Sequence, residues 1–179
     1  MNGTNNPNLK QNSDSIALQR ATGLLLVSNT PKGRGVFASQ YISKGTILEV
    51  SPVLIFSPEE VEKHTAQTVL QHYTYYWPNP SNPKGPQTQA IALGLGSMFN
   101  HSRLHQNVVW SRDIASETIT YTAHRDIKAG EELCISYGNA RLWFQDADLE
   151  DESLGIEGED ELQRSGLHAL ALVESNDVP

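Results

Sequence analysis

A polar segment in the middle of the chain carries residue types from which a ligand-binding or catalytic site can be built. The stretch Ala92–Asn107 holds two glycines and an apolar pair, followed by Asn100, His101 and Ser102. Glycine lets the backbone bend tightly or lets another group approach closely, while asparagine and histidine supply directed hydrogen-bond donors and acceptors. Such a stretch can point amide and imidazole groups into a pocket, or it can be a plain polar loop after an apolar run.

Two further segments offer complementary chemistry. Lys32, Gly33, Arg34 and Gly35 form a turn-rich stretch whose glycines allow main-chain groups to approach a charged ligand. Near the other end of the folded part, Tyr137 places a phenol hydroxyl at the end of a strand-like run. Taken singly, a glycine turn and a strand-end tyrosine are common structural features, so each keeps a purely structural interpretation.

The elements that must position these segments are mostly strands. Alternation, β-branched residues and turn signals predict strands at 22–27, 36–38, 47–56, 107–111, 117–123 and 133–137, and residues 89–93 return to apolar character before the polar segment. Pro52 within the third of these indicates a bend or an edge position. Ser57, Pro58 and Glu60 form a helix-start signature, and the helix is expected to run to about His72. The pattern therefore predicts a mainly β fold with little helix.

Length and composition limit the function classes. A chain of 179 residues suggests one domain, and it has neither an apolar run of membrane-spanning length nor a secretory signal, so a soluble intracellular protein is expected. The single cysteine, Cys134, excludes an internal disulfide and a cysteine-cluster zinc site. We interpret it as a small buried strand residue, with a catalytic nucleophile as the alternative.

Charge divides the chain into unequal parts. Residues 1–144 carry 12 basic and 10 acidic side chains, whereas residues 145–179 carry 1 and 11. We expect a disordered segment at 1–19, a domain at 20–144 and an acidic tail at 145–179 with a short helix as an option. The sequence has no cluster of basic residues of the kind that would indicate a nucleic-acid-binding surface. The tail could attract a basic partner or simply keep the protein soluble.

The three polar segments, taken in order, resemble the motifs of the SET domain, the fold of most protein-lysine methyltransferases. The resemblance covers roughly residues 20–144 and is greatest to compact stand-alone fungal members. It implies several small sheets and a C-terminal pseudoknot, in which the last segment passes through a loop. That threading is an exception to the usual avoidance of threaded loops, and it brings Asn100 and His101 beside Tyr137.

The resemblance also implies a site and a cofactor, S-adenosyl-L-methionine. Tyr137 is expected to be catalytic, and the residues expected to bind the cofactor are Lys32, Gly33, Arg34, Gly35, Asn100, His101, Tyr137, Trp143 and Phe144. The last two would cover the site, because the cysteine-rich zinc segment that often follows this domain is missing. No metal site is expected, since His101 and His105 lack further ligands.

Aromatic residues are candidates for the walls of a lysine channel. Aromatic faces suit an ammonium group, and the candidates are Tyr73, Tyr75, Tyr76, Trp77 and Trp110, of which we select Tyr73, Tyr75 and Trp110. Each of them can equally be an ordinary core residue. Trp110 lies near the position where a phenylalanine or tyrosine of the family influences how many methyl groups are added.

The function that follows is methylation of a protein lysine, expected on a basic histone tail in the nucleus, with the cytoplasm as the other location. No direct nucleic-acid or membrane partner is expected, and a homodimer is an option. The sequence departs from the family pattern at Arg103–Gln106, which favours one alternative, a catalytically weak SET-like module that binds cofactor or basic peptides. A β-rich interaction domain is the third interpretation.

Overall fold

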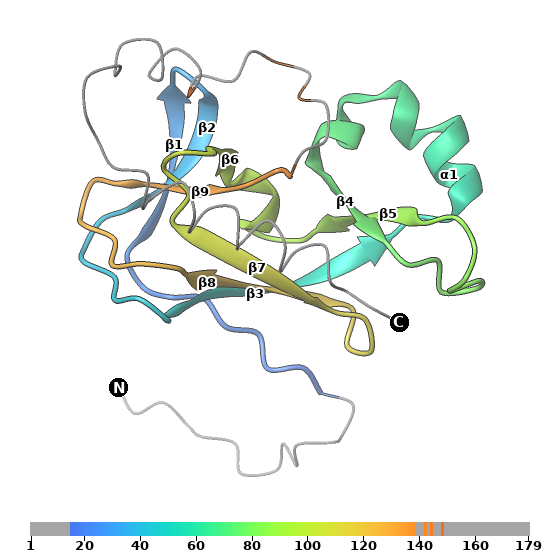
Figure 1. The fold of residues 1–179 in the computed structure, drawn as a ribbon, viewed down its shortest axis with the longest axis horizontal. Coiled ribbons are helices and arrows are strands. Elements are labelled where there is room, and N and C mark those ends of the chain that lie inside the picture. Colours follow the sequence, from blue (N-terminus) through green and yellow to red (C-terminus); the bar gives the residue numbers. More distant parts are fainter. Residues whose placement is uncertain (1–14, 139–141, 143, 145–147, 149–179) are drawn as a thin grey trace, which may run out of the picture.

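The computed structural model describes residues 15–138, 142, 144 and 148. Within these residues, nine short strands form two sheets, joined by turns and short helical segments (Figure 1). The predicted mainly β fold with little helix is therefore confirmed. No helix in this part of the chain is long and apolar enough to cross a membrane.

The smaller sheet holds the first two strands of the chain beside one of the last. Its spatial order is β1 (Leu24–Thr30), β2 (Gly33–Ala38), β9 (Glu132–Ile135) and β6 (Asn100–His101). The stretch expected to be turn-rich, residues 32–35, is mostly strand, because only Pro31 and Lys32 join β1 to β2. Gly33 has a φ of +86°, a conformation that glycine adopts without a steric penalty.

The larger sheet has the spatial order β4 (Thr74–Trp77), β5 (Thr88–Ala92), β3 (Ile47–Ile55), β8 (Thr118–Ala123) and β7 (Val108–Asp113). The strands expected at 107–111 and 117–123 are its β7 and β8, which pair as a hairpin. The two edge strands of this sheet also contact each other. The rings of Tyr75 and Trp110 lie 5.1 Å apart, and Arg112 Nη1 donates to the carbonyl of Tyr76 at 2.6 Å. The sheet is therefore curled until its edges meet.

Pro52 does not mark an edge, as one interpretation of the sequence held. It lies in the interior strand β3, at the point where one ladder ends and another begins. Residues up to Pro52 pair with β8, and residues from Val53 onward pair with β5. A residue without an N–H costs little at such a position, because no ladder there needs its missing donor.

The helix expected from Ser57 to about His72 is shorter than predicted. The capping box forms, but α1 (Pro58–Lys63) ends after six residues and is followed by the 3₁₀ turns η1 (Thr65–Gln67) and η2 (Val69–Tyr73). The hydroxyl of Thr68 donates to the carbonyl of Thr65 at 3.1 Å and accepts from the amide of Leu70 at 3.2 Å. These local bonds cap η2 and separate it from η1, beyond the end of α1 at Lys63.

A buried carboxylate ties the start of the domain to the segment that leads into the polar cluster. Glu49 is 4% exposed, and its carboxylate accepts from Arg20 Nε at 2.9 Å and from the amide of Leu95 at 2.8 Å. Gly94, with a φ of +118°, lies against this carboxylate, and a Cβ there would be 2.7 Å from Glu49 Oε1. Leu95 then leads into the 3₁₀ turn η3 (Gly96–Met98).

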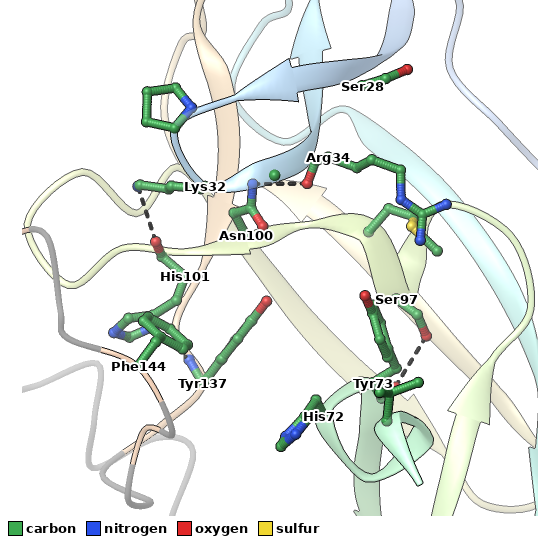
Figure 2. Close-up of a pocket in the computed structure, with 14 residues that line it drawn as sticks. Ser28, Lys32, Arg34, His72, Tyr73, Ser97, Asn100, His101, Tyr137 and Phe144 are labelled. Carbon is green, nitrogen blue, oxygen red and sulfur yellow. Dashed lines mark hydrogen bonds between the residues drawn. The ribbon is translucent and has the colours of Figure 1, made fainter.

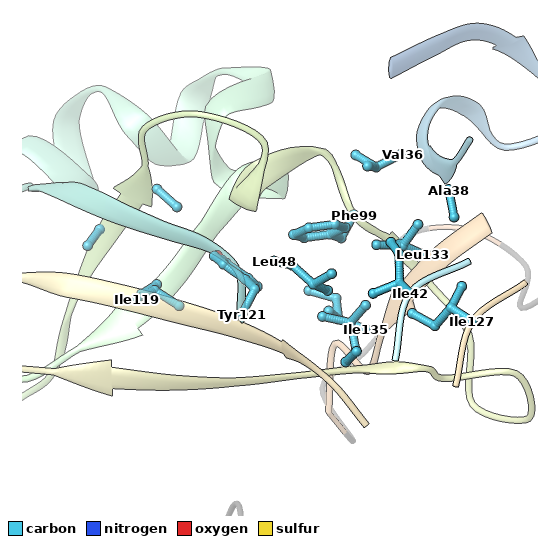
Figure 3. Close-up of a cluster of buried hydrophobic side chains, with 14 of the residues drawn as sticks. Val36, Ala38, Ile42, Leu48, Phe99, Ile119, Tyr121, Ile127, Leu133 and Ile135 are labelled. Atoms are coloured by element: carbon cyan, nitrogen blue, oxygen red, sulfur yellow. The ribbon is translucent and has the colours of Figure 1, made fainter. Parts of the chain in front are cut away.

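The apolar core joins the two sheets. Figure 3 shows Phe99 above Leu48, with Leu133 and Ile135 from β9 beside them. Phe99 is 1% exposed and its ring lies 5.0 Å from that of Tyr121. Because Phe99 directly precedes β6, the packing of this one ring fixes where the polar residues after it emerge.

The short strand β6 runs parallel to β9, with Asn100 opposite Cys134 and His101 opposite Ile135. β9 thus lies between β2 and β6 in the sheet, which agrees with the threaded arrangement that the resemblance implies. Asn107 adds a side-chain clamp, since its Nδ2 donates to the carbonyl of Glu132 at 2.8 Å and its Oδ1 accepts from the amide of Cys134 at 2.9 Å.

Replacing Asn107 by alanine should lower the free energy of unfolding by about 3 kcal/mol, because two buried main-chain groups of β9 lose their partners. Urea unfolding measures this. The exposed loop substitution Asn82→Ala is the matched control and should stay within about 0.5 kcal/mol of the parent. An equal loss of unfolding free energy in the two variants would show that the Asn107 side chain does not stabilise β9.

Candidate functional site

A pocket of about 760 Å³ opens between the smaller sheet and the turns η2 and η3 (Figure 2). Its walls come from four separate parts of the chain. The lining residues are Ser28, Pro31, Lys32, Gly33, Arg34, Val69, His72, Tyr73, Ser97, Met98, Asn100, His101, Tyr137 and Phe144. A pocket of this size and mixed polarity is typical of small-molecule binding sites.

The first polar segment reaches the pocket because β2 passes directly beside β6. The side-chain amide of Asn100 donates to the carbonyl of Arg34 at 3.0 Å and to Glu132 Oε1 at 2.7 Å. Gly35 makes this approach possible, since a Cβ at that position would lie 2.8 Å from Asn100 Nδ2. The side-chain amide nitrogen of Asn100 thus holds the segment 32–35 through Arg34 and β9 through Glu132, and Oδ1 is the remaining acceptor of that amide.

Lys32 is held over the same corner of the pocket. Its ammonium donates to the carbonyl of His101 at 3.2 Å and lies 3.9 Å from Glu132 Oε2. Both side chains are partly exposed, so this ion pair contributes little stability. Its effect is to place a positive charge at the pocket rim, where Arg34 adds a second one.

His101 is oriented by the main chain at Tyr137. Its Nδ1 accepts from the amide of Tyr137 at 3.0 Å, so the neutral ring carries its proton on Nε2. The two rings lie 5.2 Å apart. Their proximity follows from the β6–β9 ladder, which sets residues 101 and 135 opposite each other two positions before the tyrosine.

The hydroxyl of Tyr137 donates to the carbonyl of Phe99 at 2.9 Å. In Figure 2 it points toward the space between Asn100 and Tyr73. Burial raises the pKa of Tyr137 to about 12, so the phenol is protonated at neutral pH. A protonated phenol with its hydrogen engaged elsewhere still offers an oxygen lone pair to a group in the pocket.

The residues predicted for a lysine channel separate into two places. Tyr73 lines the pocket, and Ser97 Oγ donates to its carbonyl at 3.2 Å. Tyr75 instead lies behind η3, where its hydroxyl donates to the carbonyl of Gly96 at 2.8 Å and accepts from Tyr121 at 2.9 Å. Trp110 packs edge-on against Tyr75. Neither Tyr75 nor Trp110 is among the residues that line this pocket.

Phe144 lies against the centre of the site. Its ring is 6.2 Å from that of His101 and 6.4 Å from that of Tyr137, in edge-to-face geometry. Trp143, the other residue expected to cover the site, lies outside the described residues, as does the optional helix of the acidic tail.

Several site residues escaped the sequence analysis. Val69 and His72 reach the pocket because the expected helix breaks into η2, which no local pattern predicted. Tyr121 was recognisable only as an inward position of an alternating strand. Asp148 looked like one of many acidic tail residues, yet it is 5% exposed and accepts hydrogen bonds from residues 102–104.

The site suits binding and orientation better than nucleophilic or metal chemistry. Burial raises the pKa of Cys134 to about 12, so its thiol is protonated and unreactive at neutral pH. This agrees with the interpretation of Cys134 as a buried strand residue. Among residues 15–138, 142, 144 and 148, no cluster of histidine, cysteine or carboxylate side chains could hold a metal ion.

Comparisons with known proteins agree on one family. A family model described as SET domain matches residues 33–138. A curated relative from Schizosaccharomyces pombe, named histone-lysine N-methyltransferase, H3 lysine-37 specific, is 55% identical over 115 residues, which are 64% of this chain and 72% of the relative.

Solved structures are more distant in sequence. CpSET8 from Cryptosporidium is 24% identical, with a TM-score of 0.51, and the match covers 66% of this chain and 58% of that one. A candidate histone methyltransferase from Plasmodium falciparum is also 24% identical, with a TM-score of 0.49, and the match covers 71% of this chain and 99% of that one. The first of these supports the similarity of fold.

The raised pKa of Tyr137 predicts a specific pH dependence of stability. Between the unfolded pKa of about 10 and the folded value of about 12, the folded state keeps a proton that the unfolded state has lost, so stability falls as pH rises. From pH 8 to pH 11 the parent should lose about 1 kcal/mol more than Tyr137→Phe. Urea unfolding at both pH values measures the difference, and equal losses would show an ordinary, unperturbed phenol.

Proposed function

The chain belongs to the SET-domain family and is a protein-lysine methyltransferase, and we propose that it transfers methyl groups from S-adenosylmethionine to a lysine of histone H3. The observation that carries this proposal is the meeting of Asn100, His101 and Tyr137 at one pocket, beside the segment 32–35. The name of the Schizosaccharomyces pombe relative supports histone H3 as substrate and lysine 37 as the first residue to test.

The pocket residues fit S-adenosylmethionine. A methionine carboxylate requires donors and positive charge, which Lys32 and Arg34 supply at the rim. The acceptor oxygen of Asn100 and the exposed residues 32–34 suit the ammonium and ribose groups. Phe144 offers an aromatic face to the adenine or the sulfonium. When bound, the cofactor supplies a methyl group on a positively charged sulfur, a site for displacement by an amine.

The residues of this chain then have to deliver a neutral lysine in line with the methyl group. A free lysine has a pKa of about 10.4, and transfer into an apolar site lowers that pKa. Tyr137 does not act as a phenolate base, because its own pKa is about 12. Its oxygen accepts a hydrogen bond from the amine and so orients the nitrogen lone pair. Alignment of this kind supplies most of the rate enhancement.

Aromatic side chains guide the lysine to Tyr137. We propose that Tyr73, Tyr75 and Trp110 form the channel, with Tyr73 at the pocket and the other two behind η3. The Tyr75 hydroxyl is fixed by Gly96 and Tyr121, and burial raises its pKa, so it remains a neutral wall. Trp110 is broader than phenylalanine or tyrosine, and its packing against Tyr75 limits the room for successive methyl groups.

We further propose that residues 20–144 contain the catalytic domain and that, apart from the buried Asp148, the acidic residues 145–179 lie outside its catalytic core. The ion pair between Arg20 and Glu49 supports the first boundary, although Gln19, just before it, also contacts the domain, because its carbonyl accepts from the amide of Val50 at 2.8 Å. A histone substrate implies a nuclear protein that acts on chromatin, and the cytoplasm remains the other location to examine.

Replacing Tyr137 by phenylalanine should lower methyl transfer to histone H3 at least about a hundredfold, because the oxygen that orients the amine is lost. Mass spectrometry of H3 after incubation with enzyme and S-adenosylmethionine gives the lysine, the number of methyl groups and the rate. The exposed variant Tyr76→Phe is the matched control and should keep parental activity. Cofactor binding by the parent without methylation of any histone would favour a binding module instead.

Replacing Gly35 by alanine should abolish cofactor binding, because the added Cβ displaces Asn100 and the Glu132 carboxylate beside it. Calorimetric titration with S-adenosylhomocysteine measures the affinity. Gly45→Ala is the control, since that glycine has a φ of +82° and no atom within 4 Å of the new Cβ. It should cost stability but leave the affinity unchanged, and similar affinities in both variants would argue against a cofactor beside Gly35.

A further inference from the structure

Asp148 is an acidic residue that is almost fully buried although it follows the expected end of the domain. It is 5% exposed, and its Oδ2 accepts from Ser102 Oγ at 2.9 Å, from the amide of Leu104 at 3.1 Å and from the amide of Arg103. A charged side chain is rarely buried unless such partners compensate for lost water. The carboxylate is therefore part of the folded domain.

The partners of Asp148 form a small anion-binding loop. The amides of Arg103 and Leu104 converge on one carboxylate oxygen, as backbone groups do around bound anions. Ser102 joins the two halves of this loop, because its Oγ donates to Asp148 and accepts from the amide of His105 at 2.8 Å. Burial acts to raise the pKa of Asp148, but the hydrogen bonds outweigh it and the pKa is lowered.

This loop begins at the site itself. Ser102 directly follows His101, and its amide donates to the carbonyl of Ile135 at 3.1 Å, which extends the β6–β9 ladder by one bond. The same loop overlaps the stretch Arg103–Gln106, where the sequence departs from the family pattern. The departure therefore coincides with a binding site for a carboxylate from the same chain.

Phe144 lies only four residues before Asp148 and packs edge-on against His101 and Tyr137. An attachment four residues away limits how far that ring can move from the site.

We propose that Asp148 is a positioning residue, whose carboxylate fastens the chain after Tyr137 to the loop 102–104 and so holds Phe144 against the cofactor pocket. The inference rests on the proposed function only for the identity of the cofactor. The attachment itself is a property of the described contacts and can be measured without any cofactor.

The attachment is tested by hydrogen exchange and by fluorine NMR on the full chain. In Asp148→Ala the amides of Arg103 and Leu104 should exchange at least tenfold faster than in the parent. Fluorophenylalanine is incorporated, and the signal of residue 144 is assigned by its loss in Phe144→Leu. In Asp148→Ala the chemical shift of that signal should move toward the value of the free amino acid. Glu62→Gln removes an exposed acidic charge and should change neither. Unchanged exchange and an unchanged signal in Asp148→Ala would overturn the proposal.

The effect on the pocket is tested with S-adenosylhomocysteine and with steady-state kinetics. Asp148→Ala should weaken binding about tenfold and raise KM for S-adenosylmethionine similarly, while kcat at saturating cofactor stays within twofold. Asp148→Asn keeps the shape of the side chain and loses its charge, so its affinity for S-adenosylhomocysteine should lie between those of Asp148→Ala and the parent. Phe144→Ala should weaken binding to a similar degree, and adding Asp148→Ala to it should cause little further loss.

These measurements separate the two proposals. A parent protein that binds no S-adenosylhomocysteine refutes the proposed cofactor, while the exchange and fluorine data still decide whether Asp148 holds Phe144. Faster exchange in Asp148→Ala with unchanged affinity would make Asp148 a purely structural residue. Full additivity of the Phe144 and Asp148 substitutions would show that the carboxylate does not act through that ring.

Discussion

The parallel pairing of β6 with β9 is the interaction on which the site depends. Two residues, Asn100 and His101, pair with Cys134 and Ile135 from a strand more than thirty positions later. So short a ladder has little stability of its own, and β2, the Asn107 clamp and the Phe99 ring support it from three sides. Long-range contacts of this kind cost much conformational entropy, because the chain between the two strands must be closed into a loop. The site therefore forms only when most of the domain is folded.

This constraint explains why the polar residues around the pocket are bonded to main chain more than to one another. Asn100 holds Arg34, His101 receives the Tyr137 amide, and the Tyr137 hydroxyl reaches the carbonyl before β6. Each bond joins two segments that the ladder has already brought together. The result is a rigid frame in which one phenol oxygen faces the pocket, a suitable arrangement for a reaction that depends on alignment.

The sequence alone predicted part of this structure. Strand alternation located the β7 and β8 strands. Resemblance to a family selected Asn100, His101 and Tyr137 as candidate site residues, and all three line the pocket. Local hydrogen bonding was missed, since the helix that the apolar spacing favoured ends at Lys63 and the hydroxyl of Thr68 bonds its neighbours between two 3₁₀ turns. Non-local partners were missed as well: neither the contact of Asn100 with Arg34 nor the burial of Asp148 has a sequence signal, because both depend on which loops the fold brings into contact.

We propose that the β6–β9 pair assembles a methyl-transfer site at the pocket between β2 and η2. A crystal structure of the full chain with S-adenosylhomocysteine tests it most directly. We expect the ligand in this pocket, with its carboxylate near Lys32 and Arg34, its sulfur facing the Tyr137 hydroxyl and Phe144 against its ring system. A ligand bound elsewhere, or one whose sulfur is separated from Tyr137 by the side chains of Asn100 and His101, would contradict the account.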